Sequence, residues 1–240
     1  WKEGGAQDVV VQRDGQPRNT AFNKYNHHRL AYMCGEAPKF QDRISSVVGH
    51  LRESGLNGQY LDMIGNSTMA GRCYNPRHVH PKGGGSFGPD GYRVLLQRLK
   101  RENPGYPLTT EGTNEAYMDL MDGSIYCNST TLERLDAIPM FQSVYHGNYA
   151  FFGNYAYPDG TRPWDPLWPP EDRWKEEKPW PKLYPDQFYL ELGRTVAWGA
   201  QPMVCNIREN LFADPELESA RRFTLDTARF YYANREFLCD

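Results

Sequence analysis

Long apolar runs are missing from this 240-residue sequence, and so is an excess of positive charge. No stretch approaches the ~20 consecutive apolar residues of a membrane-spanning helix, so we predict no membrane span. Lysine and arginine number 27 against 30 aspartate and glutamate residues, a net charge of −3. Proteins that bind nucleic acid through its phosphates carry a basic excess, so the composition argues against a nucleic-acid partner.

Cysteine is scarce as well, with five residues far apart in the sequence and no C-x-x-C pair. This spacing predicts neither a disulfide framework nor a zinc knuckle. A nucleotide-binding glycine loop is also missing. No G-x-G-x-x-G follows a predicted strand, and the glycines at 83–85 are not followed by Lys-Ser or Lys-Thr. We therefore predict no cofactor.

The sequence also lacks a methionine or a signal-peptide pattern at its start, which is Trp1. We interpret the chain as part of a longer polypeptide that carries other domains. Any targeting segment would then lie upstream.

Aromatic residues, by contrast, are abundant: 11 Phe, 6 Trp and 16 Tyr are far too many for a disordered chain. Short strand patterns alternate with helical patterns, which is typical of βα units and a parallel sheet. The predicted strands are 8–11, 29–34, 58–64, 106–110, 124–127, 138–145 and 200–205, and the predicted helices are 38–51, 90–101, 114–121, 186–198 and 215–237.

We predict a single α/β domain, residues 1–240, folded as a (β/α)₈ TIM barrel. A full barrel needs eight strands, so its first strand or two should lie before Trp1, and an open doubly wound sheet is the alternative. Residues 149–185 are predicted to form an irregular loop rich in tryptophan and proline. Expressed alone, the chain would expose the edge of the 29–34 strand, and we expect it to aggregate or melt early.

Two acids end successive predicted strands. Asp62 follows Gln59-Tyr60-Leu61, and Glu111 follows Leu108-Thr109-Thr110. Catalytic groups of parallel barrels lie at the carboxyl ends of strands, and neighbouring strands are ~4.8 Å apart. Glycoside hydrolysis needs two carboxyl groups that flank one bond, a nucleophile and a proton donor. A single acid at a strand end is often only a helix cap or a turn residue, but two at equivalent positions favour catalysis.

Three segments around these acids carry recognisable motifs: LNGQYLDMIG at 56–65, HPKGGG at 80–85 and LTTEG at 108–112. Shorter motifs are Met33-Cys34, Asp122-Gly123 and Phe151-Phe152-Gly153. Together they resemble a group of bacterial barrel proteins over nearly the whole chain. This group belongs with the endo-α-N-acetylgalactosaminidase and α-N-acetylgalactosaminidase type of glycoside hydrolases, distant relatives of the α-amylases.

The resemblance implies a retaining hydrolase of an α-linked oligosaccharide or polysaccharide, with Asp62 as the nucleophile and Glu111 as the acid/base. It also implies a secreted or periplasmic protein. Two departures concern the α-amylase pattern. Tyr60 stands where that pattern has arginine, and the third α-amylase carboxylate has no clear counterpart here.

Further candidates for substrate binding, besides Tyr60, are histidines and tryptophans of the predicted loops: His78, His80, His146, Trp164 and Trp168. The tryptophans are candidates because aromatic rings stack on the apolar faces of sugars. His146 is a candidate because it follows a predicted strand. Cys73 lies near the histidine pair at 78 and 80, but no third ligand follows at a recognisable spacing, so we predict no metal site. Two alternatives stay open: a carbohydrate-binding pseudoenzyme with the same barrel, and a metal-dependent hydrolase that uses His78 and His80.

Overall fold

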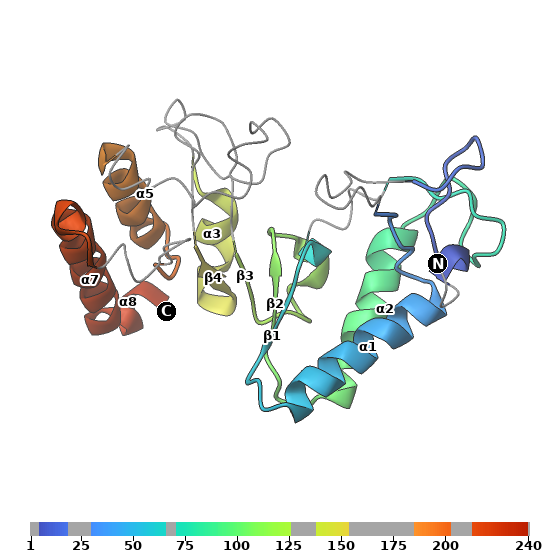
Figure 1. The fold of residues 1–240 in the computed structure, drawn as a ribbon, viewed down its shortest axis with the longest axis horizontal. Helices are drawn as coiled ribbons and strands as arrows, with labels where there is room; N and C mark the ends of the chain where they lie inside the picture. Colours follow the sequence, from blue (N-terminus) through green and yellow to red (C-terminus); the bar gives the residue numbers. More distant parts are fainter. Residues whose placement is uncertain are drawn as a thin grey trace. The chain divides into compact units, whose positions relative to one another are not determined.

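The computed structural model describes residues 5–18, 30–65, 71–125, 138–153, 185–202 and 213–239 (Figure 1). Contacts within the chain group it into two compact units, Trp1–Asp122 and Gly123–Asp240, which we call the N-terminal and C-terminal units. Among the described residues, no helix is long and apolar enough to cross a membrane.

The N-terminal unit is built on two parallel strands and two long helices. Strand β1 (Gln59–Leu61) pairs with β2 (Leu108–Glu111), and the aligned residues are Gln59 with Leu108, Tyr60 with Thr109 and Leu61 with Thr110. Helix α1 (Pro38–Glu53) precedes β1, and α2 (Phe87–Glu102) precedes β2. Strand, helix and parallel strand therefore follow one another, as the sequence pattern predicts.

Individual residues explain where helices α1 and α2 begin and where α1 ends. Proline at the first position of α1 has the backbone φ that a helix start needs, and Gly55 ends the helix region with a φ of 90°. Helix α2 packs on α1 and buries Leu95, Leu96 and Leu99 completely. It starts earlier than predicted, at Phe87 instead of Asp90, because the buried Phe87 extends its apolar face.

The first segment of the chain pairs antiparallel with the segment before α1. Val9 forms a bridge with Met33, Val10 N–H donates to the Tyr32 carbonyl, and Cys34 N–H donates to the Asp8 carbonyl. One edge of the described part of the 29–34 segment is therefore paired within the chain, and these residues form a small antiparallel pair. The expectation that the chain expressed alone aggregates or melts early stays a prediction.

The C-terminal unit contains a second parallel pair, β3 (Gly123–Ile125) and β4 (Ala150–Phe152). Phe152 forms a parallel bridge with Gln201, at the start of the predicted 200–205 strand. Helices α5 (Pro185–Ala197) and α7 (Glu218–Ala233) pack against each other, and the rings of Tyr189 and Phe223 meet edge to face at 4.9 Å.

The smaller helices complete the described elements. They are η1 (Gly5–Gln7), η3 (Glu115–Tyr117), α3 (Met140–Tyr145), η5 (His146–Asn148), η6 (Pro215–Leu217) and α8 (Arg235–Cys239). The predicted closing helix 215–237 is interrupted, because α7 ends before Asn234 and α8 begins after it.

The strand predicted at 138–145 is wrong, since Met140–Tyr145 is helix α3. Its Phe141 and Tyr145 rings lie on one helical face, 4.8 Å apart, and Phe141 also meets Phe151 of β4 edge to face. The sequence pattern missed β4. The chain therefore has an α/β fold with parallel strands, and the closed barrel stays a prediction.

Candidate functional site

The two strand-end acids lie at the same end of the β1–β2 pair, the carboxyl end of both strands. Leu61 is aligned with Thr110, and Asp62 and Glu111 are the next residues of their strands. Asp62 is exposed in the turn after β1, whereas Glu111 is the last residue of β2 and is half-buried. The structure therefore brings the two predicted catalytic residues to neighbouring strand ends.

A buried threonine joins the turn after β1 to β2. The Thr110 hydroxyl donates to the Leu61 carbonyl at 2.7 Å and accepts from Gly65 N–H at 2.9 Å. Asn114, at the start of η3, donates to the Gly65 carbonyl at 3.2 Å. These bonds hold both ends of the Asp62-containing turn against β2.

The same turn is conformationally constrained. Met63, directly after Asp62, has a backbone φ of 63°, in the left-handed region that residues other than glycine rarely adopt. A Cβ on Gly65 would lie 2.2 Å from the Glu111 carbonyl oxygen, so only glycine permits this close approach. The backbone around Asp62 is thus bent sharply and packed directly on the backbone of Glu111.

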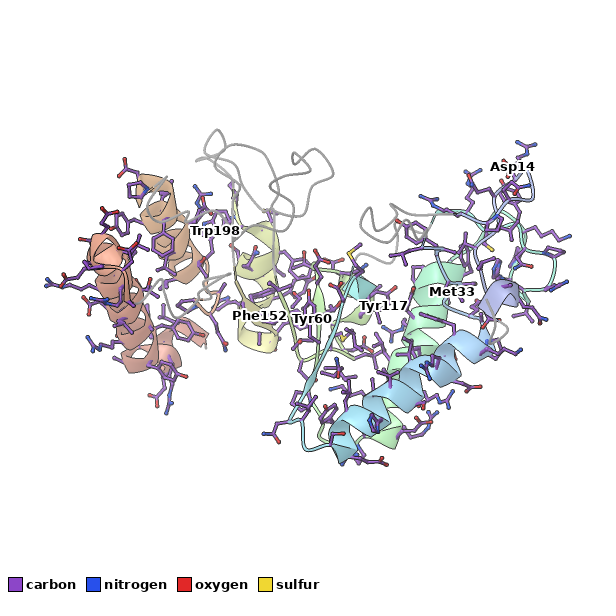
Figure 2. The ribbon with its side chains drawn as sticks, viewed as in Figure 1. Asp14, Met33, Tyr60, Tyr117, Phe152 and Trp198 are labelled. Atoms are coloured by element: carbon purple, nitrogen blue, oxygen red, sulfur yellow. The ribbon has the colours of Figure 1, made fainter. Side chains whose placement is uncertain are left out.

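Tyr60 shares a strand face with Glu111. Side chains alternate along a strand, so Thr109 and Glu111 point to one face of β2 while the buried Thr110 points to the other. Tyr60, labelled in Figure 2, is aligned with Thr109 and is 39% exposed.

The structure places His78 and His80 together with two cysteines. We call this largely buried group the cysteine–histidine cluster: Cys34, Cys73, His78 and His80. Their sulfur and ring nitrogen atoms all lie within 4.8 Å of one another. The predicted contact of His78 and His80 with a sugar substrate stays a prediction.

Burial dominates the electrostatics of the cluster. It raises the pKa of the Cys34 thiol to about 12, although backbone hydrogen bonds from Glu36 and Ala37 oppose the rise. Burial also lowers the pKa of His78, against a hydrogen bond to the Gln7 backbone. Burial therefore favours the neutral forms of the Cys34 thiol and the His78 imidazole.

Cys34 is a member of this group that the sequence pattern did not predict. It lies in the segment before α1, far upstream of Cys73, His78 and His80. The available signal was the spacing C-x4-H-x-H at 73–80 together with an unassigned cysteine at the end of a strand-like segment.

His146 lies in the C-terminal unit, in η5, directly after α3. The expectation that it follows a strand is wrong, because the residues before it are helical. Its ring lies next to Gly199, after the end of α5, where a Cβ would approach the ring within 3.6 Å. Trp164 and Trp168 lie outside the described residues, so their predicted roles stay predictions.

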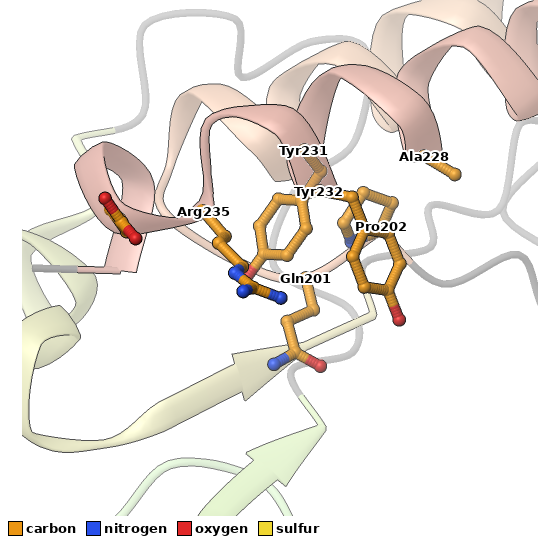
Figure 3. Close-up of a pocket in the computed structure, with 7 residues that line it drawn as sticks. Gln201, Pro202, Ala228, Tyr231, Tyr232 and Arg235 are labelled. Carbon is orange, nitrogen blue, oxygen red and sulfur yellow. The ribbon is translucent and has the colours of Figure 1, made fainter.

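A separate pocket of about 430 Å³ opens in the C-terminal unit, against the end of α7 and α8 (Figure 3). Among the described residues, those that line it include Tyr231, Tyr232, Arg235, Gln201 and Glu236.

Curated proteins similar to this chain include two that are named as hydrolases of sugars. A Bacteroides thetaiotaomicron protein named "Putative glycoside hydrolase" is 34% identical over 111 residues, 45% of this chain and 16% of that protein. A Monosiga brevicollis protein with the same name and a serial number is 26% identical over 117 residues, 47% of this chain and 10% of that protein. The matched segments are thus a small part of both relatives.

Solved structures that this chain matches in part include two glycosidases. The α-galactosidase TtGalA from Thermus thermophilus, in complex with stachyose, is 14% identical with a TM-score of 0.48, over 90% of this chain and 45% of that chain. The α-N-acetylgalactosaminidase NagBb from Bifidobacterium bifidum is 17% identical with a TM-score of 0.44, over 60% and 23%. Similarity at this level assigns no activity to the chain.

One family model matches a much larger share of the sequence. It is described as a domain of unknown function, DUF6259, and it matches residues 1–157. The matched range includes both strand-end acids and the whole cysteine–histidine cluster. More than half of the sequence follows this model, and the chain therefore belongs to the DUF6259 family.

Proposed function

We propose that this chain carries the catalytic centre of a glycoside hydrolase in which Asp62 and Glu111 are the two reacting carboxyl groups. The observation that carries the proposal is the strand register, which makes these acids the next residues after the aligned pair Leu61 and Thr110. The names of the two curated relatives support the same class of reaction.

Retention of configuration fits this register best. Neighbouring parallel strands lie ~4.8 Å apart, and retaining glycosidases hold their carboxyl groups ~5–5.5 Å apart, whereas inverting enzymes need ~6.5–9.5 Å. Asp62 then attacks the anomeric carbon and forms a glycosyl-enzyme ester, while Glu111 protonates the departing oxygen. In the second step Glu111 takes a proton from water, which attacks the anomeric carbon and releases Asp62.

The roles follow from exposure. Asp62 lies in an exposed turn after β1, and we assign it the role of the nucleophile. Glu111 is the more sheltered of the two acids, and we assign it the role of the acid/base. Tyr60, on the face of Glu111, offers an aromatic surface to the sugar ring. The substrate class, an α-linked glycan, follows from the sequence resemblance.

The experiment compares the chain with two carboxamide variants on a panel of aryl α-glycosides and mucin-type glycans. Asp62→Asn should abolish turnover on every substrate. Glu111→Gln should retain more activity on aryl glycosides with good leaving groups, which need little protonation. Asp14→Asn in an exposed turn and Glu53→Gln at the end of α1 make the same chemical changes away from the site and should keep wild-type rates.

Product stereochemistry, followed by proton NMR, tests retention directly, and azide should restore turnover of Asp62→Asn as a glycosyl azide of inverted configuration. Wild-type rates in both carboxamide variants would show that the chemistry lies elsewhere. Glycan binding without any turnover by the unmodified chain would favour the carbohydrate-binding pseudoenzyme.

A further inference from the structure

The cysteine–histidine cluster brings together side chains from two separate parts of the N-terminal unit. Cys34 lies just before α1, and the other members lie on the segment 71–86 that leads into α2. Cys34 and Cys73 are fully buried, His80 is 7% exposed, and both cysteines are free thiols. His78 is half-buried, so two sulfur and two nitrogen atoms meet in a group that is largely, but not fully, buried.

Backbone carbonyls orient the two imidazole rings. His78 Nε2 lies 3.0 Å from the Gln7 carbonyl oxygen, and His80 Nδ1 lies 3.1 Å from that of Pro81. A carbonyl oxygen only accepts, so each of these nitrogens carries the hydrogen of its ring. The lone pairs are therefore on His78 Nδ1 and His80 Nε2. Histidines that ligate metals are fixed by such carbonyl bonds in the same way.

The ring nitrogens that remain are the candidate ligand atoms. His78 Nδ1 lies 3.5 Å from Cys73 Sγ. His80 Nε2 is buried and has no hydrogen-bond partner among the described residues. A buried polar atom without a partner costs free energy, and such an atom in a native structure requires an explanation such as an ion.

From these observations we propose that the cysteine–histidine cluster binds one Zn²⁺ ion through its two sulfur atoms, His78 Nδ1 and His80 Nε2. Two thiolates and two imidazoles in tetrahedral arrangement are a typical zinc ligand set. The proposal is independent of the function proposed for Asp62 and Glu111.

The dimensions of the cluster fit this ion. Bonds of about 2.3 Å to sulfur and about 2.0–2.1 Å to nitrogen, at a tetrahedral angle, place sulfur and nitrogen about 3.6 Å apart. The distance between Cys73 Sγ and His78 Nδ1 is 3.5 Å. No two of the four ligand atoms are more than 4.8 Å apart. Even two atoms at that distance would reach tetrahedral spacing after side-chain shifts of about 1 Å.

Four protein ligands make this a structural site. A catalytic zinc ion keeps one position open for water or substrate, whereas here all four are filled. The metal-dependent hydrolase that the sequence left open is therefore disfavoured at this position. Instead, the ion connects the segment before α1 with the segment before α2.

The surroundings support a stabilising role. The His80 ring stacks on Phe87, at the start of α2, with ring centroids 4.3 Å apart. Val10, Ala37 and Phe87 pack around the two cysteines. Residues 71–86 form no helix or strand, so few backbone bonds hold them in place, and metal binding supplies folding free energy to such a segment.

The test measures metal in the purified chain, isolated through an affinity tag without histidine. Elemental analysis should find about one zinc ion per chain. After replacement with Co²⁺, the spectrum should show the visible bands of a tetrahedral ion and the near-ultraviolet thiolate-to-cobalt charge-transfer band. Cys34 and Cys73 should resist alkylation until a chelator removes the ion.

Variants assign the ligands. His80→Gln should lose most of the bound zinc and the cobalt bands, and Cys73→Ser should lose the charge-transfer band. The matched control is His50→Gln, which changes an exposed histidine on α1 and should bind metal as the unmodified chain does. A variant can lose zinc because it fails to fold. The zinc content and cobalt spectrum of the unmodified chain therefore decide whether the site exists.

Three results would overturn the proposal. An unmodified chain that folds without zinc and shows no cobalt bands after refolding with Co²⁺ does not contain this site. A disulfide between Cys34 and Cys73, seen as an intact cross-link by mass spectrometry, removes the thiolates. Unchanged zinc content in His80→Gln places the ion elsewhere.

Discussion

At the scale of single residues, Thr110 links the two acids of the proposed active centre. Its hydroxyl uses both its donor and its acceptor capacity, toward the Leu61 carbonyl and the Gly65 N–H. It is 2% exposed, so water cannot replace either bond if the hydroxyl is removed. The position of Asp62 therefore depends on a side chain that would not touch the substrate.

Replacing Thr110 with valine keeps the shape of the side chain and removes the hydroxyl. We expect Thr110→Val to destabilise the fold by about 1–3 kcal/mol, because Gly65 N–H loses its buried acceptor. Urea unfolding measures this change. Turnover should fall as well, since the turn that carries Asp62 loosens.

Thr109→Val is the matched control, because it makes the same change on the opposite face of β2. It should alter stability less than Thr110→Val does. If both variants have the same free energy of unfolding, the hydrogen bonds of Thr110 do not hold the turn.

At the scale of elements, a polar network joins α1 to α2. Arg98 of α2 bonds to Asp42 of α1 at 2.5 Å and to Glu102 of its own helix at 2.7 Å. The Ser45 hydroxyl, from α1, donates to the same Glu102 carboxylate. Two hydrogen bonds hold the pKa of Glu102 below its usual range: that from Ser45 has the larger effect, and that from Arg98 the next largest.

This network makes helix packing sensitive to acid. A carboxyl group with a lowered pKa in the folded state contributes stability above its unfolded pKa, about 4.3, and that contribution is lost as pH falls through the folded value. Glu102→Gln should therefore lose less stability than the unmodified chain between about pH 6 and pH 3. The difference should be at most about 1 kcal/mol, because the Glu102 side chain is 40% exposed.

Free energies of unfolding, measured by urea at each pH, provide the comparison. Glu53→Gln, at the end of α1, is the control and should follow the pH dependence of the unmodified chain. If Glu102→Gln follows it too, the network does not contribute to the acid response.

At the scale of the whole molecule, all four proposed zinc ligands come from the N-terminal unit. We therefore expect the effect of a chelator to be confined to that unit. Hydrogen exchange should accelerate in residues 71–86 and in the first turns of α1 and α2, because the ion no longer holds them.

Helices α5 and α7 of the C-terminal unit are the internal reference in this experiment, because they pack on each other and contribute no ligand. Their exchange rates should stay unchanged after chelation. Faster exchange throughout the chain would show that the ion stabilises more than its own unit.

Local pattern was enough to predict the parts of the molecule on which the proposed function depends. Apolar spacing, an opening proline and a closing glycine predicted α1, and short apolar runs predicted β1 and β2 with an acid after each. These signals act within a few residues, so the sequence alone carries them.

Only the tertiary structure decided the features that depend on distant partners. Met140–Tyr145 is helical and packs its Phe141 ring on β4, although its run of apolar residues fits a strand equally well. Val9 pairs with Met33, and Cys34 meets Cys73, His78 and His80, although the sequence positions of Val9 and Cys34 do not mark them as neighbours of those residues. Such contacts arise because packing and hydrogen bonding select among conformations that local propensity leaves nearly equal in free energy.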